Sequence, residues 1–207
     1  MKQTALITGA SRGIGAALAE TFARAGYQLT LCCQHSEEKL MTLSKRLQEQ
    51  YHTTVLVRIG DVGDYAFVKA MVDATLEAFG AIDVLINNAG ISYIGLLTDM
   101  SIEDWNRIVA TNLTSVFSTC RCVVPSMVHN KRGRIINISS VWGNVGASCE
   151  VAYSACKGGI NSFTRALGKE LAPSQITVNA IACGVIDTDM NRCFSEEERA
   201  GLIAEIP

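Results

Sequence analysis

The residues best suited to acid–base chemistry are a tyrosine and a lysine placed four positions apart. Tyr153 and Lys157 fall in a stretch with helical periodicity, so their side chains share one face of the expected helix. A free tyrosine has a pKa of about 10, which is too high for proton transfer near neutral pH. An adjacent ammonium group is expected to lower that pKa, which predicts Tyr153 as a general acid or base with Lys157 as its partner.

A serine upstream of this pair is placed to assist it. Ser140 ends an apolar run that is typical of a buried strand. Strand ends of a parallel sheet open onto the crevice where ligands bind, so we expect the Ser140 hydroxyl to hydrogen-bond and orient a substrate carbonyl. A Tyr–Lys pair alone is common on protein surfaces, and its combination with Ser140 and the glycine run described next favours chemistry.

The first strand-like segment leads into a glycine-rich run, Thr8-Gly9-Ala10-Ser11-Arg12-Gly13-Ile14-Gly15, and then into a helix-like segment. Glycines let the backbone turn tightly and approach a ligand without a Cβ in the way. The unpaired N–H groups and the positive dipole end of the following helix suit a phosphate. The run therefore predicts a turn that binds a pyrophosphate, with a tight turn that binds no ligand as the alternative.

Short apolar runs alternate with helix-length amphipathic stretches along the whole chain. This alternation is typical of βαβ units and predicts a parallel sheet covered by helices on both faces. We therefore predict one α/β domain over residues 1–207, a doubly wound parallel sheet of the Rossmann type. The predicted strands are Thr4–Thr8, Gln28–Cys33, Thr54–Ile59, Ile82–Ile86, Arg134–Ser139 and Ile176–Ala182, and the predicted helices are Gly13–Ala25, Glu37–Gln50, Tyr65–Phe79, Asp104–His129 and Val151–Leu171.

Composition excludes several classes of protein. The 207 residues are 48% apolar and 18% charged, with a net charge of −2, which gives no electrostatic footprint for nucleic acid. The first apolar run is too short for a signal-peptide core or a membrane span, so we expect a cytoplasmic protein. The eight cysteines include no Cys-x-x-Cys pair, so we expect small buried thiols and no metal site.

Five sequence elements together resemble the short-chain dehydrogenase/reductase family. They are Thr8-Gly9-x-x-x-Gly13-x-Gly15, Asn87-Asn88-Ala89-Gly90, Asn112, Ser140 and Tyr153-x-x-x-Lys157, in the order and at the spacings usual in that family. The resemblance covers essentially the whole chain. It implies hydride transfer between a nicotinamide cofactor and a carbonyl carbon, with Tyr153 protonating the oxygen. By the same resemblance, Lys157 also donates to the ribose hydroxyls of the cofactor, and Asn112 helps hold a water that links the lysine to solvent.

The resemblance also implies a set of cofactor-binding residues. Asp61 and Val62 match the pair that contacts adenine, and Thr188 lies in a loop that meets the carboxamide and phosphate of the cofactor. Asn88 matches an asparagine whose amide ties adjacent loops together, so it is expected to support the site without taking part in catalysis. The full predicted set is Gly9, Ser11, Arg12, Gly13, Ile14, Gly15, Asp61, Val62, Asn88, Ala89, Gly90, Tyr153, Lys157, Ile186 and Thr188.

The end of the second strand indicates which nicotinamide cofactor is used. An NAD-preferring site of this architecture places Asp or Glu there, to hydrogen-bond the ribose hydroxyls. Here the segment is Cys32-Cys33-Gln34-His35-Ser36, with no carboxylate until Glu37. Arg12 in the glycine run can supply charge-assisted hydrogen bonds to a 2′-phosphate, and NADP(H) is therefore favoured over NAD(H), with a solvated loop charge as the alternative role for Arg12.

Within the family, the resemblance is greatest to 3-oxoacyl-[acyl-carrier-protein] reductases. This implies a ketone substrate carried on an acidic acyl carrier, for which Lys131-Arg132-Gly133-Arg134 could form a landing patch. Ser174-Gln175 stands where those reductases often have a second basic residue, and its absence weakens the prediction that an acidic carrier docks here. The alternatives are reduction of another small ketone, sugar or polyol, and a protein that binds NADP(H) without turnover. A homo-oligomer, dimer or tetramer, is also expected.

Relatives of this kind continue beyond the position of Pro207 with a further helix, a strand and a glycine-containing tail. We therefore expect the domain to be incomplete at its C-terminus. One edge of the sheet should then be open, which is a liability for solubility and assembly.

Overall fold

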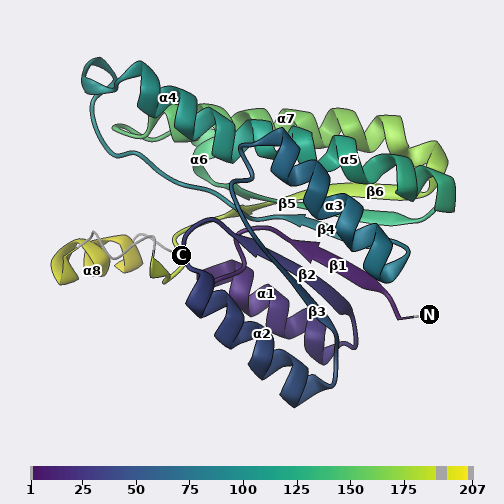
Figure 1. Cartoon of the computed structure of the whole chain (residues 1–207). Coiled ribbons are helices and arrows are strands. Elements are labelled where there is room, and N and C mark those ends of the chain that lie inside the picture. Colours follow the sequence, from purple (N-terminus) through teal and green to yellow (C-terminus); the bar gives the residue numbers. More distant parts are fainter. Residues whose placement is uncertain (1, 190–194, 205–207) are drawn as a thin grey trace.

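The computed structural model describes residues 2–189 and 195–204 and contains one six-stranded parallel sheet (Figure 1). The strand order is β3-β2-β1-β4-β5-β6, so the predicted doubly wound parallel sheet is confirmed. The strands are β1 (Thr4–Ile7), β2 (Gln28–Cys33), β3 (Val55–Ile59), β4 (Val84–Asn87), β5 (Gly133–Ser140) and β6 (Ile176–Cys183). The helices are α1 (Gly13–Arg24), α2 (Glu37–Tyr51), α3 (Tyr65–Phe79), α4 (Ile102–Val109), α5 (Ser115–Asn130), α6 (Trp142–Val145), α7 (Val151–Leu171) and α8 (Glu196–Ala204), with short turns η1 (Leu97–Asp99), η2 (Ala110–Thr114) and η3 (Ala172–Ser174).

Two hydrophobic layers form because successive side chains of a strand point to opposite faces of the sheet. In β1, Ala5 and Ile7 pack into the layer under α1 and α2, whereas Leu6 packs into the layer under α3, α5 and α7. All three side chains are fully buried. Figure 1 shows the same division, with α1 and α2 on one face of the sheet and α3, α5 and α7 on the other. The strands are apolar nearly throughout because both of their faces are covered.

The order of the strands reverses between β1 and β4, which pair in parallel although β2 and β3 intervene in the sequence. In open α/β sheets, the crevice at the carboxyl ends of two such strands is where ligands bind. The glycine run follows β1, and Asn88 to Gly90 follow β4, so both segments lie at this crevice. In the part of the chain that is described, β6 pairs only with β5 and forms the far edge of the sheet.

The helix predicted over Asp104–His129 is the main error in the predicted elements. The structure has α4, a π-helical turn over Ala110–Thr114, and then α5. A π-helical turn inserts one extra residue into the helix while the chain stays helical on both sides, so the sequence pattern continues across it. The inserted turn contains Asn112, one of the predicted site residues.

Candidate active site

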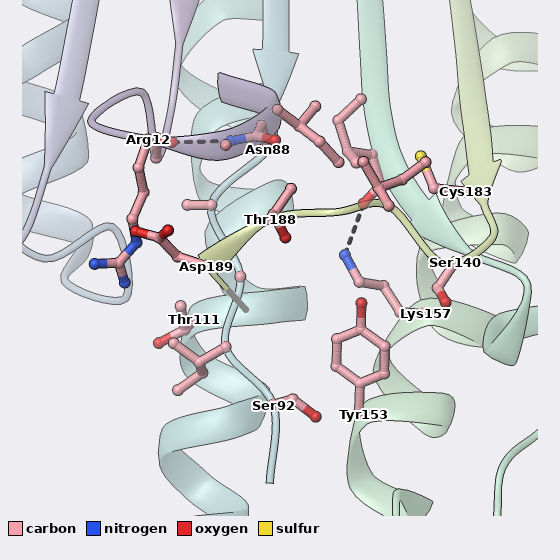
Figure 2. Close-up of a pocket in the computed structure, with 18 of the residues that line it drawn as sticks. Arg12, Asn88, Ser92, Thr111, Ser140, Tyr153, Lys157, Cys183, Thr188 and Asp189 are labelled. Atoms are coloured by element: carbon pink, nitrogen blue, oxygen red, sulfur yellow. Dashed lines mark hydrogen bonds between the residues drawn. The ribbon is translucent and has the colours of Figure 1, made fainter. Parts of the chain in front are cut away.

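A cavity of about 660 Å³ lies at the carboxyl ends of the strands (Figure 2). Segments from the ends of all six strands contribute to its wall, so residues distant in the sequence meet there. Two predicted site residues, Gly15 and Asn112, are buried behind the wall and do not line the cavity. The predicted residues that line it are Gly9, Ser11, Arg12, Gly13, Ile14, Asp61, Val62, Asn88, Ala89, Gly90, Ser140, Tyr153, Lys157, Ile186 and Thr188.

Three glycines give the turn between β1 and α1 its shape. Gly9 and Gly13 have φ angles of +65° and +54°, a left-handed conformation that favours glycine. Gly15 is needed for packing, because a Cβ there would come within 2.2 Å of the Gly9 carbonyl oxygen and 2.6 Å of Asn88 Nδ2. Gly15 therefore holds the turn against the start of α1, and its contact with a cofactor stays a prediction.

The loop after β4 is tied to the glycine turn. Asn88 Nδ2 donates to the carbonyl oxygens of Thr8 and Gly9, at 3.0 Å each. Thr8 Oγ1 in turn accepts from the backbone N–H groups of Asn88 and Ala89, also at 3.0 Å. These four bonds join the ends of β1 and β4 into one unit, and Figure 2 shows Asn88 beside the turn that carries Arg12.

The start of α1 leaves backbone donors free for an anion. Arg12, the residue before the helix, has extended backbone and makes no side-chain capping hydrogen bond, and the first turn of the helix contains no acidic residue. The first N–H groups of a helix have no partner within the helix, so they can bind phosphate oxygens. Thr188 lies against the same turn. If Gly13 were replaced by a residue with a Cβ, that atom would lie 3.3 Å from the methyl group of Thr188. This cradle fits a dinucleotide pyrophosphate.

The other end of the cavity wall is formed at the ends of β2 and β3. Cys33 ends β2 and Gln34, His35 and Ser36 follow it. All four line the cavity beside Arg12, without a carboxylate among them. The wall also includes Asp61 and Val62 after β3. One carboxylate oxygen of Asp61 accepts from the N–H of Gly63 at 2.7 Å, which fixes its orientation.

Tyr153, Ser140 and Lys157 meet at the opposite end of the same cavity. Tyr153 and Lys157 lie on one face of α7, and Ser140 ends β5. The Lys157 ammonium lies 5.4 Å from the centre of the Tyr153 ring, and the Ser140 hydroxyl acts to lower the pKa of Tyr153. Figure 2 shows the Tyr153 hydroxyl and the Lys157 nitrogen projecting into the same part of the cavity. The structure thus brings the predicted proton donor, Tyr153, together with its predicted partner Lys157 and with Ser140, which is expected to orient the substrate carbonyl.

The lowering of the Tyr153 pKa by Lys157 together with the positive nicotinamide ring of an oxidised cofactor stays a prediction. The pKa of Tyr153 is raised above its ordinary value, chiefly because burial disfavours the phenolate, although the Ser140 hydroxyl acts in the opposite direction. Lys157 is not among the groups that shift this pKa, and its Nζ donates to the Ile138 carbonyl oxygen at 2.7 Å. Burial also lowers the pKa of Lys157 from 10.5 to about 8. A protonated, buried phenol is suited to donating a proton.

Asn112 acts on the wall of the cavity from behind. Its side chain is fully buried, accepts from the N–H of Ile91 at 3.0 Å and donates to the Ile91 carbonyl oxygen at 2.8 Å. A Cβ on Gly90 would come within 2.8 Å of Asn112 Oδ1 and 3.8 Å of Lys157 Nζ. The π-helical turn therefore places Asn112 to hold the loop after β4 close to Lys157. Its expected role in binding a water stays a prediction.

Some residues of the cavity were not predicted from the sequence. Cys183 ends β6, pairs in register with Ser140, and raises the pKa of Tyr153. Ser92 and Glu150 form another part of the wall. Glu150 precedes Tyr153 by three residues, a helical spacing that places two side chains near each other, and this signal could have revealed it.

The basic segment at residues 131–134, considered as a docking site for an acyl carrier, lies at the end of the sheet opposite the cavity. Residues 131–134 precede or begin β5, whereas Ser140 ends β5 at the cavity. At about 3.3 Å per residue the two ends of this strand lie roughly 23 Å apart. Arg132 is also paired with Asp83, at 2.5 Å. The segment therefore does not border the mouth of the cavity.

Two further features bear on the class of protein. No helix within residues 2–189 and 195–204 is long and apolar enough to cross a bilayer. In the same described part of the chain, no three or more His, Cys, Asp and Glu side chains converge in a group that could hold a metal ion.

Comparisons with known proteins agree with this geometry. The 3-oxoacyl-[acyl-carrier-protein] reductase FabG of Escherichia coli (strain K12) is 40% identical over 203 residues, which cover 98% of this chain and 81% of that protein. The uncharacterized oxidoreductase YmfI of Bacillus subtilis (strain 168) is 37% identical over 207 residues, which cover all of this chain and 84% of that protein. A crystal structure of a metagenomic short-chain oxidoreductase in complex with NADP has a TM-score of 0.84 at 34% identity, covering 88% of this chain and 82% of that one.

The sequence also matches the family described as short chain dehydrogenase over residues 3–199. The match spans the glycine turn, Ser140 and the Tyr153–Lys157 pair, whose side chains meet in the cavity at the strand ends. This chain is a member of the short-chain dehydrogenase/reductase family of oxidoreductases.

Proposed function

We propose that this protein is an NADP(H)-dependent carbonyl reductase in which Tyr153 donates the proton. The observation that carries the proposal is the meeting of Ser140, Tyr153 and Lys157 in the same cavity as the glycine turn. A protein that only binds a dinucleotide has no need of all three side chains beside its ligand. The structural similarity to an oxidoreductase in complex with NADP, and the sequence similarity to a 3-oxoacyl-[acyl-carrier-protein] reductase, support the same conclusion.

Residues at both ends of the cavity would hold the cofactor. The turn from Gly9 to Gly13 and the first N–H groups of α1 would bind the pyrophosphate of the cofactor. Lys157 would donate hydrogen bonds to the hydroxyls of the nicotinamide ribose. When bound, the nicotinamide supplies a hydride to the carbonyl carbon of the substrate.

The chain's own residues would bind and protonate the carbonyl oxygen. Ser140 donates a hydrogen bond that fixes the position of this oxygen, and Tyr153 Oη transfers its proton to it as the alcohol forms. Burial keeps the phenol protonated, because it raises the pKa of Tyr153. Lys157 is held in place by the Ile138 carbonyl at 2.7 Å and packs over the tyrosine ring.

We expect the protein to bind NADPH at least about tenfold more tightly than NADH, a difference of roughly 1.4 kcal/mol. Arg12 lines the cavity beside the carboxylate-free end of β2, where a 2′-phosphate would lie. Replacing Arg12 by alanine should remove most of the difference by weakening NADPH alone, in a fluorescence titration of both cofactors. Arg24→Ala, at the exposed far end of α1, is the matched control. Equal affinities in the unmodified protein would contradict the proposal.

Two substrate classes are compatible with the proposed reaction. A 3-oxoacyl thioester is supported by the similarity to the Escherichia coli reductase. A small ketone is favoured by the position of the basic segment at residues 131–134, which lies far from the cavity and offers no landing site for an acidic carrier there.

The function is tested by following NADPH oxidation with a panel of ketones, sugars and a 3-oxoacyl thioester. We expect reduction of at least one ketone at a rate that depends on enzyme concentration. A protein that binds NADPH tightly and oxidises it with no member of the panel would favour the alternative of a non-catalytic NADP(H)-binding protein.

A further inference from the structure

A carboxylate lines the cavity near Tyr153 and takes no part in the chemistry proposed above. Glu150 is the residue before α7, the helix that carries Tyr153, and its half-buried side chain lines the cavity. Its Oε2 accepts a hydrogen bond from Ser92 Oγ at 2.6 Å. Ser92 belongs to the loop after β4, and Figure 2 shows its hydroxyl directed toward the Tyr153 side of the cavity.

The ordinary role of an acidic residue at the start of a helix does not account for this arrangement. Acidic side chains there commonly accept hydrogen bonds from the first backbone N–H groups of the helix. The Glu150 side chain makes no such bond to α7. It reaches instead to Ser92, 58 residues away in the sequence, so the wall of the cavity sets its direction.

The negative charge of Glu150 has no cationic partner in the described part of the chain. No lysine, arginine or histidine nitrogen among these residues lies within 4.0 Å of its carboxylate. Lys157, the cation in this part of the cavity, is directed at the Ile138 carbonyl, and Glu150 is not among the groups that affect its pKa. Glu150 does raise the pKa of Tyr153 through its charge. Its field therefore acts on the space beside the phenol, where the substrate would bind.

We propose that Glu150, held by Ser92, forms a subsite for a positively charged group, and that the preferred ketones of this enzyme carry an ammonium group. The inference rests on the proposed carbonyl reduction and names the substrate class for it. A partly buried carboxylate attracts a cation more strongly than one in bulk water, and this attraction acts on primary and quaternary ammonium groups alike. The same charge disfavours keto acids, and a neutral ketone gains nothing from it.

The test compares ketones of the same shape and different charge. The first ketone carries a quaternary trimethylammonium group, which, unlike a primary amine, cannot condense with a carbonyl. The second carries an uncharged tert-butyl group in the same position. The third carries a carboxylate there. With NADPH, we expect kcat/KM to be at least about tenfold higher for the cationic ketone than for its neutral isostere, because the charges attract directly, and lowest for the keto acid.

Two variants assign the preference to the subsite. Glu150→Gln keeps the shape of the side chain and removes its charge, so the ratio of the two kcat/KM values should fall toward one. Ser92→Ala leaves the charge and removes the hydrogen bond that orients it, so the ratio should fall by a smaller factor. Glu77→Gln, an exposed position on α3, is the matched control and should keep the full ratio.

Each other outcome overturns the inference in a recognisable way. Reduction of the cationic and neutral ketones with equal efficiency would overturn the subsite and leave the proposed reductase intact. An equal loss on both ketones in Glu150→Gln would mean that the residue acts through Tyr153 or through the fold. The absence of NADPH oxidation with every ketone would overturn the proposed function together with the subsite.

Discussion

Replacing Tyr153 by phenylalanine is expected to lower the rate of carbonyl reduction by about 10²- to 10⁴-fold, the usual contribution of a general acid. The substitution removes only the hydroxyl group, which is the proton donor. The ring remains, so the packing of Lys157 over it at 5.4 Å is kept. Because the glycine turn lies at the other end of the cavity, binding of NADPH should change little. Steady-state kinetics and a fluorescence titration of NADPH measure the two properties separately.

The matched control for this prediction is Tyr51→Phe. Tyr51 ends α2 and its hydroxyl bonds to Glu20 outside the cavity, so its removal should leave the rate unchanged. Retention of more than about a tenth of the rate in Tyr153→Phe would mean that another group supplies the proton. A parallel loss of NADPH binding would instead mean that the hydroxyl is needed for the cofactor site.

Replacing Lys157 by methionine is expected to reduce the reduction rate strongly and to change how stability depends on pH. Lys157 is buried, and its pKa falls from 10.5 in the unfolded chain to about 8 in the folded protein. Between these values the unfolded chain binds more protons, so the free energy of unfolding rises with pH. The contribution is fully present above pH 10.5 and is lost as the pH falls through 8.

Methionine has no charge to bury, so the stability of Lys157→Met lacks the pH dependence that the buried ammonium gives to the wild type. The wild type should therefore gain about 2–3 kcal/mol relative to Lys157→Met between pH 7 and pH 10. Urea denaturation of both proteins at several pH values measures the difference. Lys169→Met, at an exposed position on the same helix, should follow the wild type throughout. Parallel curves for Lys157→Met and the wild type would show that the ammonium is not desolvated.

The order and bounds of most elements were predictable because they depend on local patterns. The helices over Tyr65–Phe79 and Val151–Leu171 and the strand over Gln28–Cys33 have the predicted bounds, and the remaining strands differ by one or two residues at one or both ends. Alternating apolar runs, amphipathic stretches and glycines are all properties of neighbouring residues. A parallel sheet then brings its strand ends to one edge, so the sequence was also enough to place Ser140 and Tyr153 in the same cavity as the glycine turn.

The environment of each side chain depended on contacts between distant segments. The direction of the Lys157 ammonium is set by the Ile138 carbonyl of β5, and the raised pKa of Tyr153 by burial among several elements. Asn112 is placed by a π-helical turn that the sequence pattern does not reveal.

The sequence by itself determined which side chains are available for chemistry and the parallel sheet that gathers them. Only the tertiary structure decided what each of them faces. Glu150 is bonded to Ser92, 58 residues away, and residues 131–134 lie at the opposite end of β5 from Ser140. The reason is physical: periodicity reports which residues are buried, whereas charge, hydrogen bonding and pKa depend on neighbours that only the packed chain supplies.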